Sequence, residues 1–291
     1  MLSSITQKIK SVPSYFYRNY AAPQIYSIRD RKILSKNLEL KDKYSGQRCF
    51  LIGAGPSIAT TDLSKLKNEY AFVVNEFEKT SQHKVLSPSF HIISESNYYI
   101  EGGPEYWLNR FKEESNIISV ETTMIINLRA IPFMEKHGLF QKHNVYYVGT
   151  QGIFSEKLPF NIGLNKYIPN PKNSILLCLV AAIWMGFNEI YLLGCEHSFL
   201  ARPLDKKRGL SWRATHNLND IGDEALKKYL DPKSIALNYE ASMADVLQLF
   251  RNYRLLYAKA RNINPELKIY NATPNSFLDV FPMINFENIR F

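Results

Sequence analysis

The feature that most constrains this chain is a series of short apolar segments that alternate with segments of helical pattern. We expect strands at 48–52, 70–74, 89–93, 117–120, 144–148, 189–193 and 268–271. We expect helices at 173–185, ended by Gly186, and at 243–261, where apolar residues recur at helical spacing. This alternation predicts an α/β fold, with a mostly parallel Rossmann-like sheet and helices on both faces.

Composition excludes several other classes of protein. At 291 residues, 45% hydrophobic and 22% charged, the chain suits a folded α/β domain and excludes disordered and collagen-like proteins. Its three cysteines form no CxxC pair, so we expect neither a disulfide framework nor a zinc or redox motif. The sequence shows no apolar run of about 18 residues and no secretory leader pattern. We therefore expect a cytoplasmic protein.

Positive charge is concentrated at the start of the chain. The formal net charge is +9, and residues 1–48 carry ten basic side chains against three acidic ones. We interpret residues 1–46, which include Pro13, Pro23 and four aromatic residues at 15–20, as a basic extension outside the main core. Residues 47–291 would then form the catalytic domain. The extension suits an anionic membrane surface at the inner membrane, and a solvated or partner-packed extension is the alternative.

Parallel sheets bind ligands beyond the carboxyl ends of their strands, so the residues after each strand are the candidate site. The first strand is followed by a glycine-rich turn of Gly53, Ala54, Gly55, Pro56 and Ser57. Such a turn brings backbone N–H groups close to a phosphate or ribose. It lacks the glycine that the dinucleotide fingerprint needs at 58, and no Walker A lysine follows. A plain strand–helix turn is the alternative.

The other strand ends also carry polar side chains, which we take as candidate nucleotide-sugar ligands. They are Asn75 and Ser94 after the second and third strands, Asn173 and Ser174 at the start of the apolar helix, and Glu196, His197 and Ser198 after the strand at 189–193. An Asx turn at Asn75 and helix capping at Asn173 would account for these two residues without a ligand.

The segment at 200–220 is rich in cations and has little apolar periodicity, which is typical of a lid loop. Its candidate catalytic residues are Arg202, Arg208 and Arg213, with Trp212 as a donor contact and His216 as general base. His197 is the second candidate for the base. A solvated surface loop is the alternative. The sequence contains no DxD pair, no HExxH and no carboxylate cluster at ligand spacing, so we expect no metal or other cofactor.

Four segments in this order resemble a known family. They are GAGPS at 53–57, VVNEF at 73–77, NSILLCLVAAIWMGFNEIYLLGCEHSF at 173–199 and KIYNATPNSFLDVFP at 268–282. Together they resemble the bacterial sialyltransferases of the Campylobacter lipooligosaccharide type. They equally resemble the wider relatives of that group, the motility-associated flagellin glycosyltransferases and the 6-hydroxymethylpterin pyrophosphokinase-like domain. The resemblance covers roughly residues 47–285, with gaps.

The resemblance implies a single-domain variant of the GT-A fold that uses a CMP-activated sugar without a metal. In that reading Gly53–Ser57 hold the cytidine phosphate and ribose, Asn75 contacts the phosphate or sugar, and Asn173 and Ser174 contact the base or the sugar carboxylate. His216 is the general base. The sequence departs from the family pattern at two places: Ala54 replaces an asparagine in the glycine turn, and Ser198 stands where the family has a tyrosine. Other residues would therefore have to stabilise the leaving phosphate.

The leading hypothesis is a metal-independent, inverting glycosyltransferase of lipopolysaccharide or capsule biosynthesis. Its donor would be a CMP-activated ulosonic acid (sialic acid, pseudaminic acid or 3-deoxy-octulosonic acid), and its acceptor an oligosaccharide or glycolipid; the chain would act alone or as a homo-oligomer. One alternative is an ATP-dependent pterin pyrophosphokinase, which would need magnesium. Another is a basic nucleic-acid adaptor. Since no nucleic-acid-binding motif is present, we expect no nucleic-acid partner.

Overall fold

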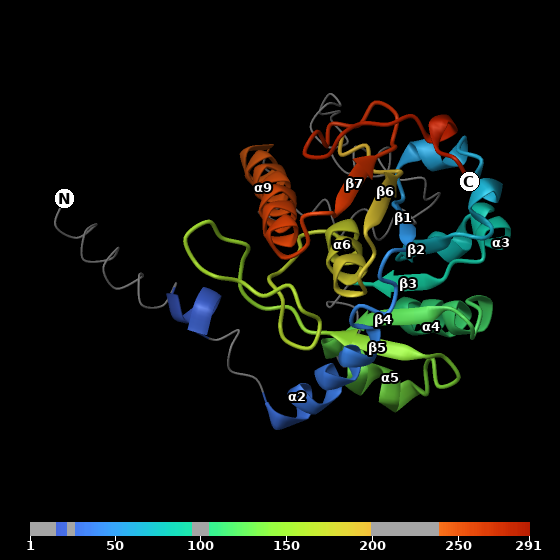
Figure 1. The fold of residues 1–291 in the computed structure, drawn as a ribbon. Helices are drawn as coiled ribbons and strands as arrows, with labels where there is room; N and C mark the ends of the chain where they lie inside the picture. The colour runs from blue at the N-terminus through green and yellow to red at the C-terminus, as the bar shows by residue number, and fades with distance from the viewer. Residues whose placement is uncertain (1–15, 22–26, 95–104, 199–238) are drawn as a thin grey trace.

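A seven-stranded sheet forms the centre of the molecule, and every pairing between neighbouring strands is parallel (Figure 1). The computed structural model describes residues 16–21, 27–94, 105–198 and 239–291. The strands are β1 (Arg48–Ile52), β2 (Tyr70–Val74), β3 (Phe90–Ile93), β4 (Thr123–Asn127), β5 (Val145–Val148), β6 (Glu189–Leu193) and β7 (Lys268–Asn271). These pairings confirm the predicted α/β class.

Helices and short helical turns join the strands. The α-helices are α2 (Ile28–Ser35), α3 (Gln82–Leu86), α4 (Glu105–Ile117), α5 (Ile131–His137), α6 (Ser174–Trp184) and α9 (Tyr239–Ile263). The shorter turns are η1 (Tyr17–Ala21), η3 (Lys36–Leu40), η4 (Pro56–Ala59), η5 (Leu63–Leu66), η6 (Phe77–Lys79), η8 (Leu128–Ala130) and η10 (Phe286–Asn288). The glycine turn after β1 leads into η4, a 3₁₀ turn of four residues, and not into an α-helix.

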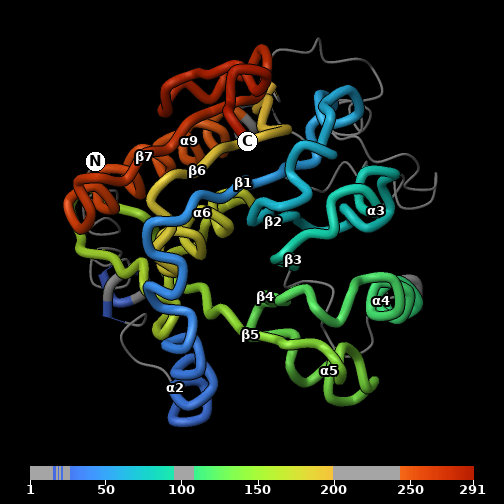
Figure 2. Tube along the Cα trace, turned by 45° about the vertical axis from the view of Figure 1, so that its right-hand side comes forward, coloured from blue at the N-terminus to red at the C-terminus, as the bar shows by residue number. Residues whose placement is uncertain are grey.

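The strand order is β5-β4-β3-β2-β1-β6-β7, so the first strand of the chain, β1, is an interior strand of the sheet (Figure 2). From β1 the chain builds outward through β2, β3, β4 and β5. It then returns to the other side of β1 for β6 and β7. The direction of winding therefore reverses between β1 and β6, and ligands of open parallel sheets bind at such a switch point.

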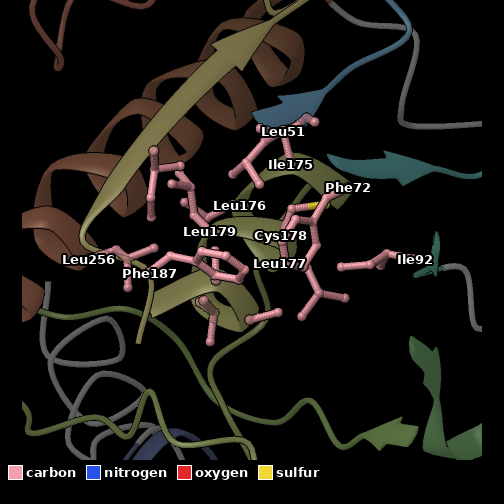
Figure 3. Packing of buried hydrophobic residues seen from close by; sticks show 14 of the residues in the cluster. Leu51, Phe72, Ile92, Ile175, Leu176, Leu177, Cys178, Leu179, Phe187 and Leu256 are labelled. Carbon is pink, nitrogen blue, oxygen red and sulfur yellow. The ribbon is translucent and has the colours of Figure 1, made fainter. Parts of the chain in front are cut away.

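Apolar residues on both faces of the strands hold the helices to the sheet. On β1, Cys49 and Leu51 join the cluster that contains α6 and α9, whereas Phe50 and Ile52 join the cluster of η4 and η5 on the opposite face. Figure 3 shows the first cluster, in which the α6 side chains lie between the sheet and α9. A third cluster packs α4 and α5 against the end of the sheet that contains β4. Burial on both faces explains why the strands are continuously apolar.

The helix α6 follows the sequence prediction closely. Asn173 is its N-cap, with the side-chain oxygen accepting from the N–H of Leu176 at 2.8 Å. The chain leaves the helix through Gly186, whose φ of +87° favours glycine. Residues 174–182 are all buried, which is why the helix shows apolar residues on every side.

Two sequence expectations are wrong. Residues 117–120 do not form a strand: Ile117 ends α4, Ile118 packs inward, and Val120 is half exposed, while the strand itself begins at Thr123. The apolar run there belongs to a helix end and a turn, which have the same composition as a short strand.

The second correction concerns the basic extension. The prediction that residues 1–46 lie outside the main core is wrong for its second half. Leu34 and Leu40 are buried, and the fully buried Asn37 donates through Nδ2 to the carbonyls of Tyr147 and Leu164, each at 2.7 Å. This segment packs at the β5 edge of the sheet, so the core begins well before β1 (Figure 2).

Candidate functional site

The turn after β1 lies against the turn after β6 at the switch point. The N–H of Gly53 donates to the carbonyl of Leu193 at 2.8 Å, and that of Gly55 to the carbonyl of Gly194 at 3.0 Å. A Cβ on Gly55 would lie 2.5 Å from the Gly194 oxygen, although the φ of Gly55 is −70°. Glycine is therefore required at 55 by the close approach of the two turns and not by its own backbone angle.

One backbone N–H of the glycine turn, which the sequence suggests as a phosphate ligand, is already hydrogen-bonded to a carboxylate of the protein. The N–H of Ser57 donates to Glu196 Oε1 at 2.7 Å. The other oxygen of Glu196, Oε2, and the hydroxyl of Ser57 are buried and have no hydrogen-bond partner among the described residues. A buried oxygen atom without a partner is costly, so both atoms would gain from a hydrogen-bond donor that reached them.

Polar side chains from four places, the ends of β2, β3 and β4 and the start of α6, meet at the same edge of the sheet. The amide of Asn75, after β2, donates to Ser174 Oγ at 3.1 Å, and Ser174 Oγ lies 2.6 Å from Ser94 Oγ, after β3. Asn127, at the end of β4, donates to the carbonyl of Ser94 at 3.5 Å. The ends of these strands therefore lie together with the start of α6.

A second group centres on Tyr253 of α9. Its hydroxyl lies 3.0 Å from Asn173 Nδ2 and 3.1 Å from His197 Nε2. Because Asn173 and Ser174 are adjacent at the start of α6, the two polar groups form a continuous set. Tyr253 falls in the helix predicted at 243–261, and nothing in the sequence distinguishes its hydroxyl from a solvent-facing one.

His197 is held in a defined tautomer. Its Nδ1 lies 2.9 Å from the carbonyl of Cys195, which can only accept, so Nδ1 carries the proton and Nε2 accepts from Tyr253 or Asn173. Burial is the main cause that lowers the pKa of His197 to about 4, so the ring is neutral at pH 7. Its φ of +51° is unusual for a residue other than glycine.

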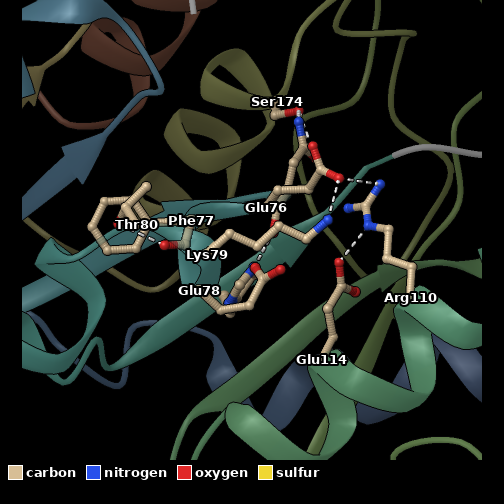
Figure 4. Close-up of polar contacts among 10 residues, drawn as sticks. Glu76, Phe77, Glu78, Lys79, Thr80, Arg110, Glu114 and Ser174 are labelled. Atoms are coloured by element: carbon tan, nitrogen blue, oxygen red, sulfur yellow. Dashed lines mark hydrogen bonds and ion pairs between the residues drawn. The ribbon is translucent and has the colours of Figure 1, made fainter. Parts of the chain in front are cut away.

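A buried cluster of charged groups lies next to Asn75 (Figure 4). Arg110 of α4 contacts Glu76 at 3.1 Å and Glu114 at 2.6 Å. Desolvation and the nearby Glu114 carboxylate raise the pKa of Glu78. The cluster therefore ties α4 to the turn that carries Asn75.

The candidates fall into two sets. The first set lies among the described residues, at the ends of β1, β2, β3 and β6 and at the start of α6: Gly53, Ala54, Gly55, Pro56, Ser57, Asn75, Ser94, Asn173, Ser174, Glu196, His197 and Ser198. Arg202, Arg208, Trp212, Arg213 and His216, together with the lid loop at 200–220, lie outside the described residues. Across the part of the chain that the structure describes, no three His, Cys, Asp or Glu side chains are grouped as for a metal ion. Nor, in those same ranges, is any helix long and apolar enough to cross a membrane.

Similarity to known proteins is found only at the level of solved structures, and it is distant. No family model matches the chain, and no curated protein matches it. Among solved structures the chain is similar to the MAf glycosyltransferase from Magnetospirillum magneticum AMB-1, with 13% sequence identity and a TM-score of 0.48. The match covers 90% of this chain and 39% of that one, so the chain spans about two fifths of that protein's length. The residues at the strand ends must therefore indicate the function.

Proposed function

We propose that this chain is a metal-independent, inverting glycosyltransferase that moves a CMP-activated ulosonic acid to a bacterial surface-glycan acceptor. The observation that carries the proposal is the gathering of Asn75, Ser94, Asn173 and Ser174 at the carboxyl edge of a parallel sheet. The order of the four sequence segments, which resembles the bacterial sialyltransferases, supports the same function.

The chemistry of this edge suits the donor. A CMP-activated ulosonic acid carries a phosphate and a carboxylate, and the start of α6 offers neutral amide and hydroxyl donors together with the positive end of the helix dipole. Asn75, Asn173 and Ser174 are the residues that would contact these anionic groups.

The nucleoside would occupy the glycine turn. The N–H of Ser57 already donates to the Glu196 carboxylate. A phosphate placed at the same N–H would therefore lie beside a second anion and be repelled by it. The ribose hydroxyls are neutral donors, so they fit Glu196 Oε2 and Ser57 Oγ. We therefore place ribose at this turn and the phosphate towards α6.

In the reaction we propose, His216 accepts the proton of the acceptor hydroxyl. The hydroxyl oxygen then forms a bond to the anomeric carbon while the bond from that carbon to the phosphate oxygen breaks, with inversion. CMP leaves with the bonding electron pair, and Arg202, Arg208 and Arg213 would stabilise its charge. His197 is the weaker candidate for the base, since its Nε2 already faces Tyr253 in a buried position.

The test is a mass-spectrometric transfer assay of CMP-sugars against extracted bacterial oligosaccharides and glycolipids. Wild-type protein should release CMP and form product equally with and without EDTA, and His216→Ala should abolish transfer but retain CMP binding. His137→Ala, which changes a histidine at the last residue of α5, is the matched control and should transfer normally. Full activity of His216→Ala would move the base elsewhere, and magnesium-dependent consumption of ATP would indicate a pyrophosphokinase instead.

A further inference from the structure

A histidine lies inside the sheet, in the strand that leads to Ser94. His91 is in the middle of β3, paired in register with Val73 on one side and Met124 on the other, and it is fully buried. A polar side chain in such surroundings is costly unless a hydrogen bond compensates for its lost hydration. The burial of this histidine therefore needs a compensating hydrogen bond.

The ring makes one short hydrogen bond, to the backbone of Asn75. His91 Nε2 lies 2.6 Å from the Asn75 carbonyl oxygen, and Nδ1 has no hydrogen-bond partner among the described residues. Because a carbonyl can only accept, Nε2 carries the proton and donates it. Burial lowers the pKa of His91 to about 4, so the neutral ring is the form present at neutral pH.

Asn75 has a backbone conformation that needs support. Its φ is +48°, in the left-handed region that side-chain-bearing residues seldom adopt. Its N–H donates to the carbonyl of Ile92 at 2.9 Å, and its own carbonyl accepts from His91. Both polar backbone groups of Asn75 are thus held by β3, and the side chain is left to meet Ser174.

We infer that His91 is a positioning residue, which fixes the left-handed backbone of Asn75 and so aims the Asn75 amide at the donor. The inference rests on the proposed function, because it assumes that the amide contacts a CMP-sugar. His91 itself is buried and touches no substrate.

The test uses CMP as the probe, with isothermal titration of the full chain. His91→Leu removes the donor and should weaken CMP binding about 5- to 10-fold, the size of one lost hydrogen bond. His91→Gln keeps an N–H donor and should retain most of the affinity. His143→Leu is the matched control, because His143 Nε2 lies 3.0 Å from the carbonyl of Ile118, outside the polar set. That variant should bind CMP as the wild type does.

A double variant separates positioning from general loosening of the fold. Asn75→Gly keeps the left-handed backbone accessible but removes the amide, so His91→Leu should have no further effect on CMP binding in that background. Equal losses with and without the Asn75 amide, or wild-type affinity of His91→Leu, would overturn the inference.

Two results keep the question decidable if His91→Leu does not fold. Nitrogen-15 NMR of the wild-type histidine rings should show His91 protonated at Nε2; protonation at Nδ1 instead would overturn the inference. If the ring is protonated at Nε2, His91→Gln should retain CMP affinity. A loss of CMP affinity in His91→Gln would also overturn the inference. Failure of the wild type to bind CMP would refute the proposed function, whereas the NMR result would still report on the contact with Asn75.

Discussion

The hydroxyl of Tyr253 joins α9 to the start of α6 and to the turn after β6. It is fully buried and lies within hydrogen-bond distance of Asn173 and His197. We expect Tyr253→Phe to lower the free energy of unfolding by about 1–2 kcal/mol, because the buried His197 ring and the half-buried Asn173 amide lose a partner. It should also weaken CMP binding, because Asn173 loses a constraint on its amide.

Tyr257→Phe is the control for this prediction, one turn further along α9, where the ring packs on Phe281. Chemical denaturation of both variants measures the difference. Equal stability of Tyr253→Phe and the wild type would show that the hydroxyl does not hold the polar set together.

The Glu78 carboxyl should make stability depend on pH. Desolvation by burial, followed by the Glu114 carboxylate, raises its pKa to about 8; Arg110 and Glu76 also face it, and His91 Nε2 lies 3.9 Å away. A carboxyl with a raised pKa stabilises the fold in its protonated form. That stabilisation is complete below the unfolded pKa, near 4.5, and is lost as the pH rises through 8.

We therefore expect Glu78→Gln to become more stable relative to the wild type as the pH rises from 5 to 8, by at most about 1.4 kcal/mol per pH unit. Denaturation across this range measures the effect. Glu156→Gln is the control, since Arg254 lowers the pKa of that exposed carboxyl and keeps it ionised throughout the range. A parallel response of the wild type and Glu78→Gln would contradict the prediction.

Among the elements, the glycine turn shows how two strand ends are fitted together. A Cβ on Gly55 would lie 1.6 Å from Glu196 Oε2 as well as close to the Gly194 carbonyl. We expect Gly55→Ala to destabilise the protein by about 1–3 kcal/mol, and Glu196→Ala to restore part of that loss because only the carbonyl clash would remain.

Gly46→Ala is the comparison for the turn, because its φ of +79° strains any side chain while nothing lies within 4 Å of the new Cβ. Glu196→Ala should not change the cost of that substitution. If Glu196→Ala failed to relieve Gly55→Ala in denaturation measurements, the close contact between the two turns would be contradicted.

Local patterns predicted the elements that are buried on both faces. The bounds of β1, β2, β6 and β7 match the apolar runs because a continuous run of such residues fits a covered parallel strand. The apolar run at 117–120 was wrongly predicted as a strand, because a helix end followed by a turn can have the same composition as a short strand. Burial of Leu34 and Leu40 was not predictable either, since it depends on packing against β5, about a hundred residues further along the chain.

The candidate site was predictable as a location but not as a set of contacts. Parallel topology alone brings Asn75, Ser94 and Ser174 to one edge. The pairing of Ser57 with Glu196 could not be inferred, because it joins the turns after β1 and β6, which become neighbours only in the folded sheet. The role of Tyr253 was not predictable either, because its partners Asn173 and His197 come close to it only in the folded protein.

At the scale of the whole molecule, truncation should divide the basic extension in two. Removing residues 1–26 keeps Leu34, Asn37 and Leu40, and we expect it to preserve the melting temperature and CMP binding. Removing residues 1–46 also deletes Leu34, Asn37 and Leu40 and should prevent folding, because the carbonyls that Asn37 satisfies lose their donor. Circular dichroism and thermal melts distinguish the two truncations.

The first truncation also tests the proposed membrane contact. Residues 1–26 contain Lys8, Lys10 and Arg18 beside several aromatic residues, a composition that suits an anionic lipid surface. We expect the full chain to sediment with anionic vesicles and the truncated chain to remain in the supernatant. Equal sedimentation of both would refute the contact.

Titration of the full chain with CMP tests the central claim most directly, because the proposed donor site is built from described residues at the carboxyl edge. We predict saturable binding in the micromolar to millimolar range. Ser174→Ala and Asn75→Gly should weaken it about 5- to 10-fold, while Ser115→Ala should leave it unchanged, because the Ser115 hydroxyl donates to the carbonyl of Lys112 within α4. Absence of binding by the wild type at millimolar CMP, or equal binding by all four proteins, would contradict the account.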